Sequence, residues 1–321
     1  MDRDPARGVC NDESTGVEAM SIGLQIAWMI SLPIVTILLV AVLFTGISLK
    51  VTARIDRRYG PPIYQPVIDL VKLVSLKSNV SHGLIFNWGL LVAIGGSTAA
   101  LLMVPMGGIH IFSGSGDLLV LIYLMLVSSL GVGLSVGASE NPNASMAASR
   151  SLMLGLGYEV PFLLILLAMM TYYHTTSLMD LVMLQRAGGM LGVLRFPLSA
   201  IAGLLIMPAM QGVRPFDIVT APQEVASGTM VELGGKFLAL SVIEHSLHAM
   251  VVLSLYVDIF FGGATNLGIF FLKVTGLFLA GVLINAVYPR FRVEQALRYC
   301  WRWPTWFALA GLIMAMVIKG A

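Results

Sequence analysis

The sequence predicts an all-α polytopic membrane protein with about eight transmembrane helices and two long structured cytoplasmic loops. Composition, charge and eight apolar stretches of membrane-spanning length support this fold class. The 321 residues are 57% hydrophobic and only 11% charged, and the mean hydropathy is +0.88. Soluble domains carry about 25% charged residues, so a soluble single-domain enzyme is excluded. The net charge of +2 argues against a nucleic-acid-binding face, which needs a concentrated basic patch.

A helix needs about 20 mainly apolar residues to cross the hydrocarbon layer of a membrane. Eight stretches meet this requirement, at about residues 22–49, 84–107, 117–138, 151–173, 189–210, 237–262, 267–288 and 303–319. We expect residues 22–321 to form a single eight-helix transmembrane domain that follows a polar N-terminal tail, residues 1–21. The segment 174–188 is short and mildly amphipathic, which is typical of a helix that lies at the membrane surface.

Lysine and arginine are distributed unequally between the two sides of the predicted bundle. The loops after the odd-numbered spans hold 13 of these residues, and the opposite side holds 5. Positive residues are enriched on the cytoplasmic side of membrane proteins. The asymmetry therefore predicts that both termini lie outside and that the long loops 50–83 and 211–236 are cytoplasmic.

The first long loop combines basic residues with a stiff turn and a short helix. Arg54 and Arg58 precede a Gly-Pro-Pro sequence, which forces a turn. Residues 67–76 then read as a short helix at the membrane interface, with Asp69 and Lys72 on one side. The arginines alone could serve only to fix the orientation of the protein, but that role leaves the turn and the helix unexplained.

The second long loop carries three acids, Asp217, Glu224 and Glu232, at the predicted cytoplasmic mouth of the bundle. Three interpretations are open. The acids could be solvated surface residues, part of a binding surface for a partner subunit, or the entry of a proton path.

Glu159 is predicted to lie inside the fourth span, about eight residues or roughly 12 Å from its start. A charge at the bilayer centre costs at least about 2.5–3.5 kcal/mol on insertion scales, so ionisable residues in spans are functional candidates. Pro161 follows in the sequence and loosens the helix backbone. We expect Glu159 to take up and pass on a proton. The alternative is a neutral, hydrogen-bonded structural acid.

Two further pairs of polar residues occur in the last spans. Glu244 and His248 are four residues apart and share a helix face, whereas His245 points about 100° away. This pair could be a proton relay or a hydrogen bond between helices. Asp258 and Lys273 lie at similar depths on either side of a turn, so we expect a structural ion pair. No histidine has partners at metal-ligand spacing, so no metal is expected.

Six motifs occur along the chain in an order that is specific to one family. They are Arg54 with Arg58-Tyr59-Gly60-Pro61, Gln65-Pro66 with Asp69 and Lys72, Arg150 with Tyr158-Glu159, Arg214-Pro215-Phe216-Asp217 with Glu224, Gly228 and Glu232, then Glu244, and Arg292 with Glu294-Gln295. Over about residues 22–319 the chain resembles the membrane subunit 1 family that respiratory complex I shares with energy-converting membrane-bound NiFe-hydrogenases.

The resemblance implies a membrane-anchor and coupling subunit of a multisubunit redox-driven ion pump, in the plasma (inner) membrane of a prokaryote. The subunit would join iron–sulfur and large hydrogenase-like subunits on the cytoplasmic side to antiporter-like membrane subunits. The residues implied in docking the redox arm are Arg54, Arg58, Gln65, Asp69, Lys72, Arg150 and Arg214. Those implied in a proton or ion path are Glu159, Glu244, His248, Glu232, Glu224 and Asp217. The chain itself would hold no cofactor and no catalytic residue; iron–sulfur clusters, and a NiFe centre in a hydrogenase, would belong to the partners.

Two departures from complex I favour the hydrogenase-like branch, or a sibling complex that reduces polysulfide. Thr220 and Pro222 stand where complex I members typically carry two further acids, and loop 50–83 is shorter than theirs. One alternative keeps the family and makes the chain a quinone-chamber subunit of an NADH:quinone oxidoreductase-type complex, with Arg54, Asp217 and Glu224 at the chamber mouth. A stand-alone secondary transporter is an alternative of another class, which the weak inverted symmetry and the patterned loops argue against.

Overall fold

The computed structural model describes residues 35, 37–77, 83–108, 112, 114 and 116–320. The predicted tail 1–21 and the beginning of the first predicted span lie outside these residues. Contacts divide the chain into two units, Met1–Val40 and Ala41–Ala321. The helices named below belong to the second unit, except for the first four residues of the helix Ile37–Ile55.

The described part of the chain is helical and contains no strand, as predicted for a polytopic all-α membrane protein. Seven of the described helices are long and apolar enough to cross a membrane. They are Ile37–Ile55, α3 (Leu84–Met103), α4 (Asp117–Gly137), α5 (Pro142–Tyr173), α10 (Lys236–Phe261), α11 (Leu267–Val287) and α12 (Val293–Gly320). The shorter helices are α2 (Gln65–Ser75), α6 (Leu178–Ala187), α7 (Gly192–Arg195), α8 (Pro197–Met210), α9 (Pro222–Val225) and the 3-10 helix η1 (Gly228–Met230).

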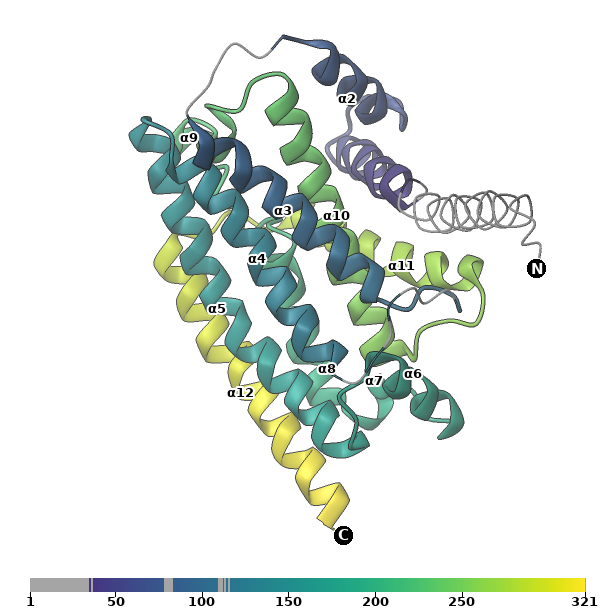
Figure 1. Cartoon of the computed structure of the whole chain (residues 1–321). Coiled ribbons are helices and arrows are strands. Elements are labelled where there is room, and N and C mark those ends of the chain that lie inside the picture. Colours follow the sequence, from purple (N-terminus) through teal and green to yellow (C-terminus); the bar gives the residue numbers. More distant parts are fainter. Residues whose placement is uncertain are drawn as a thin grey trace, which may run out of the picture. The chain divides into compact units, whose positions relative to one another are not determined.

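Helices α3, α4, α5 and α12 run side by side, each packed along the next (Figure 1). At the closest approach of α3 and α4, a Cβ added to Gly89 would lie 2.8 Å from the carbonyl oxygen of Gly131, and one added to Gly131 would lie 2.7 Å from that of Gly89. Small residues allow membrane helices to pack backbone against backbone in this way. Helix α10 packs against α3, α4, α8 and α11 and is the most buried of the candidate spans. Two of its acids, Glu244 and Asp258, are therefore enclosed by protein.

Helix α5 begins nine residues before the predicted span 151–173 because Asn141 caps it. The Asn141 side chain accepts a hydrogen bond from the backbone N–H of Asn143 at 3.0 Å, and Pro142 occupies the first turn. At 1.5 Å per residue, the 32 residues of α5 extend about 48 Å, more than the hydrocarbon thickness of about 30 Å. Glu159 thus lies near the middle of a long helix and not near its start.

The predicted fifth span, residues 189–210, is broken in the structure. Residues Gly192–Arg195 form α7, and α8 starts only at Pro197, because the residue before a proline is disfavoured in helical conformation. The 14 residues of α8 extend about 21 Å, which is too short to cross the hydrocarbon layer. The backbone after Met210 therefore has to be satisfied by protein or by water in a cavity.

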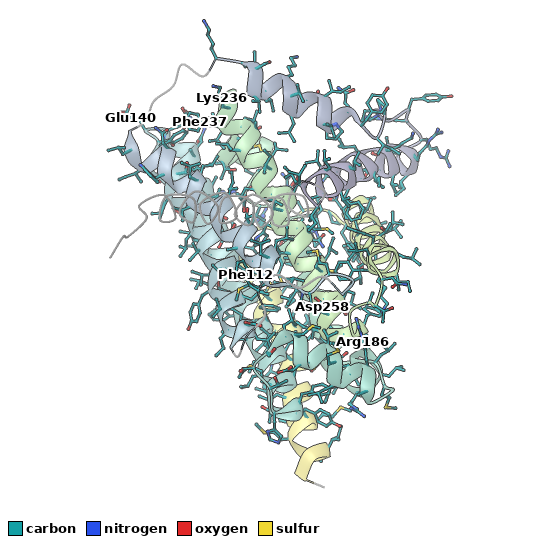
Figure 2. The ribbon with its side chains drawn as sticks, turned by 45° about the vertical axis from the view of Figure 1, so that its right-hand side comes forward. Phe112, Glu140, Arg186, Lys236, Phe237 and Asp258 are labelled. Atoms are coloured by element: carbon teal, nitrogen blue, oxygen red, sulfur yellow. The ribbon has the colours of Figure 1, made fainter. Side chains whose placement is uncertain are left out.

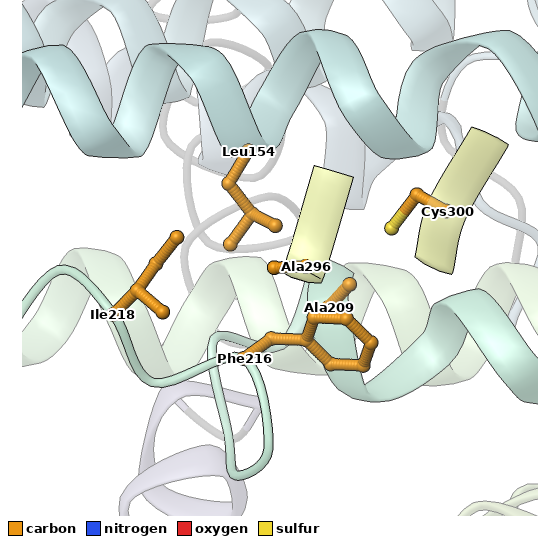
Figure 3. Packing of buried hydrophobic residues seen from close by; sticks show 6 residues of the cluster. All are labelled: Leu154, Ala209, Phe216, Ile218, Ala296 and Cys300. Atoms are coloured by element: carbon orange, nitrogen blue, oxygen red, sulfur yellow. The ribbon is translucent and has the colours of Figure 1, made fainter. Parts of the chain in front are cut away.

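A small apolar cluster anchors the loop that follows α8 (Figure 3). The cluster consists of Leu154, Ala209, Phe216, Ile218, Ala296 and Cys300. Phe216 is 1% exposed, and its ring contacts those of Phe291 and Tyr299 at centroid distances of 5.6 and 5.4 Å. Since α5, α8 and α12 all contribute to this packing, the loop is held against the bundle, and the neighbouring Asp217 is fixed in place.

Candidate functional site

A polar cavity of about 360 Å³ lies among α5, α8, α10 and the loop that follows α8. The end of α8 forms part of its wall, so the shortness of that helix opens the space. The titratable side chains in the lining are Tyr158, Asp217, Glu244, His245 and His248. Serine, threonine and amide side chains complete the polar part of the lining. A cavity of this size and polarity can hold water, which needs several hydrogen-bonding partners.

Glu244 of α10 is a buried acid of the cavity, 7% exposed, and it accepts hydrogen bonds from neighbouring helices. Ser128 Oγ of α4 donates to Glu244 Oε1 at 2.8 Å, and Ser97 Oγ of α3 lies 3.5 Å from the same oxygen. The two hydroxyls are 2.6 Å apart. Sequence reasoning missed both serines, because a single serine in an apolar span is common. The only available signal was that their spans neighbour one another.

No hydrogen bond joins the side chains of Glu244 and His248, for which a proton relay and a hydrogen bond between helices were the two interpretations. His248 instead bonds to the backbone of Met210, while Glu244 is bonded to the serines. Both side chains nevertheless line the large cavity. His245, predicted to point about 100° away, lines it as well and is exposed to it. The cavity thus reaches around more than one face of α10.

A smaller cavity of about 20 Å³ extends the polar region to Glu159. Besides Glu159, its lining includes Ser129, Tyr158, Met210 and His248, all of which also line the large cavity. Glu159 is half-buried. The structure therefore brings Glu159, Glu244 and His248 together around two adjoining cavities.

Asp217 lies at the loop side of the large cavity and is held by two donors. Arg290 Nη2 donates to Asp217 Oδ2 at 2.7 Å, and the Thr220 hydroxyl donates to Asp217 Oδ1. Thr220 occupies one of the two positions at which complex I members typically carry an acid. Here its hydroxyl contributes a hydrogen bond to Asp217.

The other two acids of this loop do not line the cavity. Glu224 forms an ion pair with Arg150 of α5, with Nη1 and Oε2 2.8 Å apart, and its side chain is 49% exposed. Glu232 accepts a hydrogen bond from the Asn141 amide at 2.7 Å. Exposed ion pairs contribute at most about 1 kcal/mol. Glu224 and Glu232 therefore tie the loop to the start of α5, and Asp217 is the loop acid that reaches the interior.

The residues predicted to dock a redox arm lie at the protein surface. Arg54, Arg58, Asp69, Lys72 and Arg214 are exposed, and Gln65 and Arg150 are partly exposed. The Arg54 guanidinium lies over the ring of Tyr59, 5.7 Å from its centroid. Gln65 Nε2 donates to Asp69 Oδ1 at 3.0 Å across one turn of α2. These residues are accessible for contact with another protein.

The predicted ion pair between Asp258 and Lys273 is not a direct contact, because the ammonium group of Lys273 is bonded elsewhere. Lys273 Nζ donates to the carbonyl oxygens of Phe261 at 2.9 Å and Gly263 at 2.6 Å. Arg186 Nε of α6 donates to the carbonyl of Gly262 at 2.9 Å. The two cations bind the end of α10 because the last carbonyls of a helix lack intrahelical donors and carry partial negative charge.

Asp258 itself is fully buried beside these cations, and neither of its carboxylate oxygens has a hydrogen-bond partner among the described residues. Figure 2 shows Asp258 and Arg186 at one end of α10, with Lys236 and Phe237 at the other. Sequence reasoning missed Arg186, because it belongs to the segment 174–188, whose pattern is typical of a surface helix.

These observations define a class: a polytopic helical membrane protein that encloses acids and histidines in a polar interior. Among the described residues, no group of three or more His, Cys, Asp and Glu side chains could hold a metal ion. The sequence profile of the NADH dehydrogenase family matches residues 28–316, and the chain belongs to this family, the membrane subunit 1 family that the motifs resemble.

Known relatives match this chain over nearly their full length. The chain is 30% identical over 300 residues to hydrogenase-4 component C of Escherichia coli (strain K12), a match that covers 89% of this chain and 94% of that protein. It is 28% identical over 301 residues to an NADH-quinone oxidoreductase subunit of Protochlamydia amoebophila (strain UWE25), covering 85% and 91%. A chain in the structure of the membrane-bound sulfane sulfur reductase, an archaeal respiratory membrane complex, has 37% identity and a TM-score of 0.85, covering 89% of this chain and 98% of that one.

Proposed function

We propose that this chain is the membrane-anchor and coupling subunit of a multisubunit redox-driven ion pump, of the energy-converting hydrogenase type or a related sulfur-reducing type. One observation carries the proposal: two adjoining cavities bring Asp217, Glu244, His248 and Glu159 together inside a helical membrane protein. Ionisable residues are expensive in a membrane and are retained there mostly for function. The similarity to hydrogenase-4 component C and to the sulfane sulfur reductase chain supports this branch of the family.

The proposed path starts at the loop and ends at Glu159. Asp217 lies at the loop side of the large cavity, His245, Glu244 and His248 follow along α10, and the small cavity leads on to Glu159. Water in the cavities would carry protons between these groups, because no direct hydrogen bond joins Glu244 to His248. Glu224 and Glu232 act outside this path, where they hold the loop against the start of α5.

Coupling would work as an electrostatic switch with two states. Electron transfer in an attached redox arm changes the charge or the position of the loop, which the Arg290–Asp217 and Arg150–Glu224 ion pairs hold in the described state. A change at Asp217 then biases the proton occupancy of the acids deeper in the cavity. Antiporter-like membrane subunits beside this chain would respond to that occupancy.

The docking surface for the redox arm consists of the charged loops and α2. Helix α2 exposes Ile68, Val71 and Val74, at 51, 68 and 51%, next to the charged side chains of the same loop. Apolar patches rimmed by polar residues mark protein interfaces. We assign this surface to the cytoplasm, with both termini outside, and place the iron–sulfur clusters, and the NiFe centre of a hydrogenase, in the partner subunits.

The Glu159→Gln variant tests the proposal. Glutamine keeps the shape of the side chain but cannot exchange a proton, so redox-driven ion translocation should fall at least about tenfold, while the partner subunits still co-purify. Glu140→Gln, which changes an exposed acid beside α5, is the matched control and should translocate normally. Normal coupled pumping by assembled Glu159→Gln complexes would contradict the proposal. Isolation of the wild-type chain without redox subunits would favour a stand-alone transporter.

A quinone-chamber role is the second candidate, and the similarity to the NADH-quinone oxidoreductase subunit favours it. In this case the large cavity would admit a quinone headgroup near Asp217. Sensitivity of the purified complex to a quinone-site inhibitor would support this candidate. Inhibitor-insensitive hydrogen evolution or sulfur reduction by the same preparation would reject it.

A further inference from the structure

A second solvent-accessible hollow, separate from the polar cavity, lies where α5 and α12 pack together. This groove has a volume of about 510 Å³, and α12 begins at its edge. Its charged lining consists of Arg150, Glu224, Arg292, Glu294 and Arg298. Neither the proposed proton path nor the apolar core uses the last three of these residues.

The groove carries positive charge that the described part of the chain does not neutralise. Arg150 is paired with Glu224 at 2.8 Å. Glu294 lies in the first turn of α12, where an acid complements the partial positive charge of a helix start. Arg292 and Arg298 form no ion pair with any described residue, and both are exposed. Guanidinium groups bind phosphate oxygens through paired, charge-assisted hydrogen bonds, so the groove matches an anion with several oxygens.

The residues next to the groove indicate where it lies relative to a membrane. Trp301 follows Arg298 by three residues and is 60% exposed, and Trp303 is 53% exposed with Arg302 over its ring at 5.5 Å. On α5, Met153 follows Arg150 by three residues and is 50% exposed. Tryptophans are enriched at the level of lipid headgroups, and exposed apolar side chains on spans face acyl chains. The arginines thus lie at headgroup level, directly above a surface suited to acyl chains.

We propose that the groove between α5 and α12 binds the phosphate headgroup of an anionic phospholipid through Arg292 and Arg298. Basic pockets between membrane helices bind such headgroups. The exposed side chains of Trp301 and Met153 favour a lipid over free phosphate, because free phosphate has no apolar part that could contact them. They also distinguish it from an acidic protein segment, which would lie in water and not across this boundary.

The experiment uses the full chain, with the subunits that purify with it, in nanodiscs of defined composition. The double variant Arg292→Gln/Arg298→Gln removes both charges and keeps polar side chains of similar reach. Arg302→Gln is the matched control, because it removes an arginine of the same helix that stacks on Trp303 and does not line the groove. Bound phosphatidylglycerol and phosphatidylcholine are counted by native mass spectrometry after transfer to detergent, and inorganic phosphate is tested as a competitor.

The proposal predicts that wild type and Arg302→Gln retain phosphatidylglycerol in preference to phosphatidylcholine, and that the double variant loses this retention about tenfold. Phosphatidylglycerol retained equally by the double variant would overturn the proposal. Displacement of the lipid by millimolar inorganic phosphate would also overturn it, because the acyl chains would then add nothing. If redox subunits dissociate from the double variant in pure phosphatidylcholine, the arginines hold a protein partner, which again overturns it.

Discussion

Helix α10 carries two buried carboxylates in opposite environments. Glu244 lies beside a cavity and accepts hydrogen bonds from serines of two neighbouring helices. Asp258, fourteen residues further on, is fully buried, and no residue in the described part of the chain donates a hydrogen bond to it. It lies near two cations that are bound to the end of the helix. Burial alone therefore does not identify a functional acid. Contact with the cavity is the further feature that sets Glu244 apart, because a proton would need a route to and from the carboxylate.

The difference also separates two kinds of stabilisation. Leaving a buried polar group without partners costs free energy, and the serines satisfy Glu244 directly. Asp258 has only the through-space attraction of Arg186 and Lys273, whose donors are directed at backbone carbonyls. We therefore expect changes at Glu244 to affect ion movement and changes at Asp258 to affect stability.

The largest effect is expected for Glu244→Gln. The glutamine carbonyl can still accept the Ser128 hydrogen bond, so the fold should persist, but the group no longer titrates. Redox-driven ion translocation by the assembled complex should fall at least about tenfold. Ser246→Ala is the control, because the Ser246 hydroxyl donates to the Val242 carbonyl of its own helix. Full ion translocation by the Glu244→Gln complex would contradict the expectation that Glu244 serves ion movement whereas Asp258 serves stability.

The next largest effect is expected on stability, from substitutions of Asp258 and Lys273 that are combined in a double-mutant cycle. Asp258→Asn removes the carboxylate charge, and Lys273→Met removes the ammonium that binds the Phe261 and Gly263 carbonyls. If the two charges attract each other through space, the double variant should lose less stability than the sum of the single variants, with a coupling of about 1 kcal/mol. Unfolding of the purified chain in detergent measures this quantity. Additive losses of stability would show that Lys273 does not stabilise the Asp258 carboxylate, which would leave Arg186 as its cation.

Hydropathy predicted most of the fold because a helix that crosses a membrane must contain about 20 apolar residues, and this requirement is visible in the sequence. It failed at residues 189–210 because hydropathy counts apolar residues and not breaks in the backbone. The restriction that Pro197 places on Phe196 shortens α8, and the space gained there becomes part of the cavity. Glu244 lines this cavity and Glu159 lines the small cavity that adjoins it. Both could be picked out in the sequence because acids inside spans are few.

What the sequence could not supply was the partner of each polar side chain. The similar depth of Asp258 and Lys273 predicted that they form a pair. The lysine instead donates to the backbone carbonyls of Phe261 and Gly263. Backbone acceptors of this kind cannot be predicted from the side chains alone. Spacing along α10 predicted a pair of Glu244 with His248. The hydroxyls that bind Glu244 come instead from α3 and α4, and no pattern within one helix could indicate them.

The smallest effect, and the sharpest test of how Glu244 is held, compares the two serines. Ser128 donates at 2.8 Å, whereas Ser97 lies at 3.5 Å, the outer limit of a hydrogen bond. Hydrogen bonds between membrane helices contribute about 0.6 kcal/mol on average. We expect Ser128→Ala to lower the free energy of unfolding by about this amount and Ser97→Ala by less, with translocation largely retained in both. Equal losses would instead indicate that the 2.6 Å contact between the hydroxyls makes them a single unit, in which Ser97 orients the Ser128 proton toward the carboxylate.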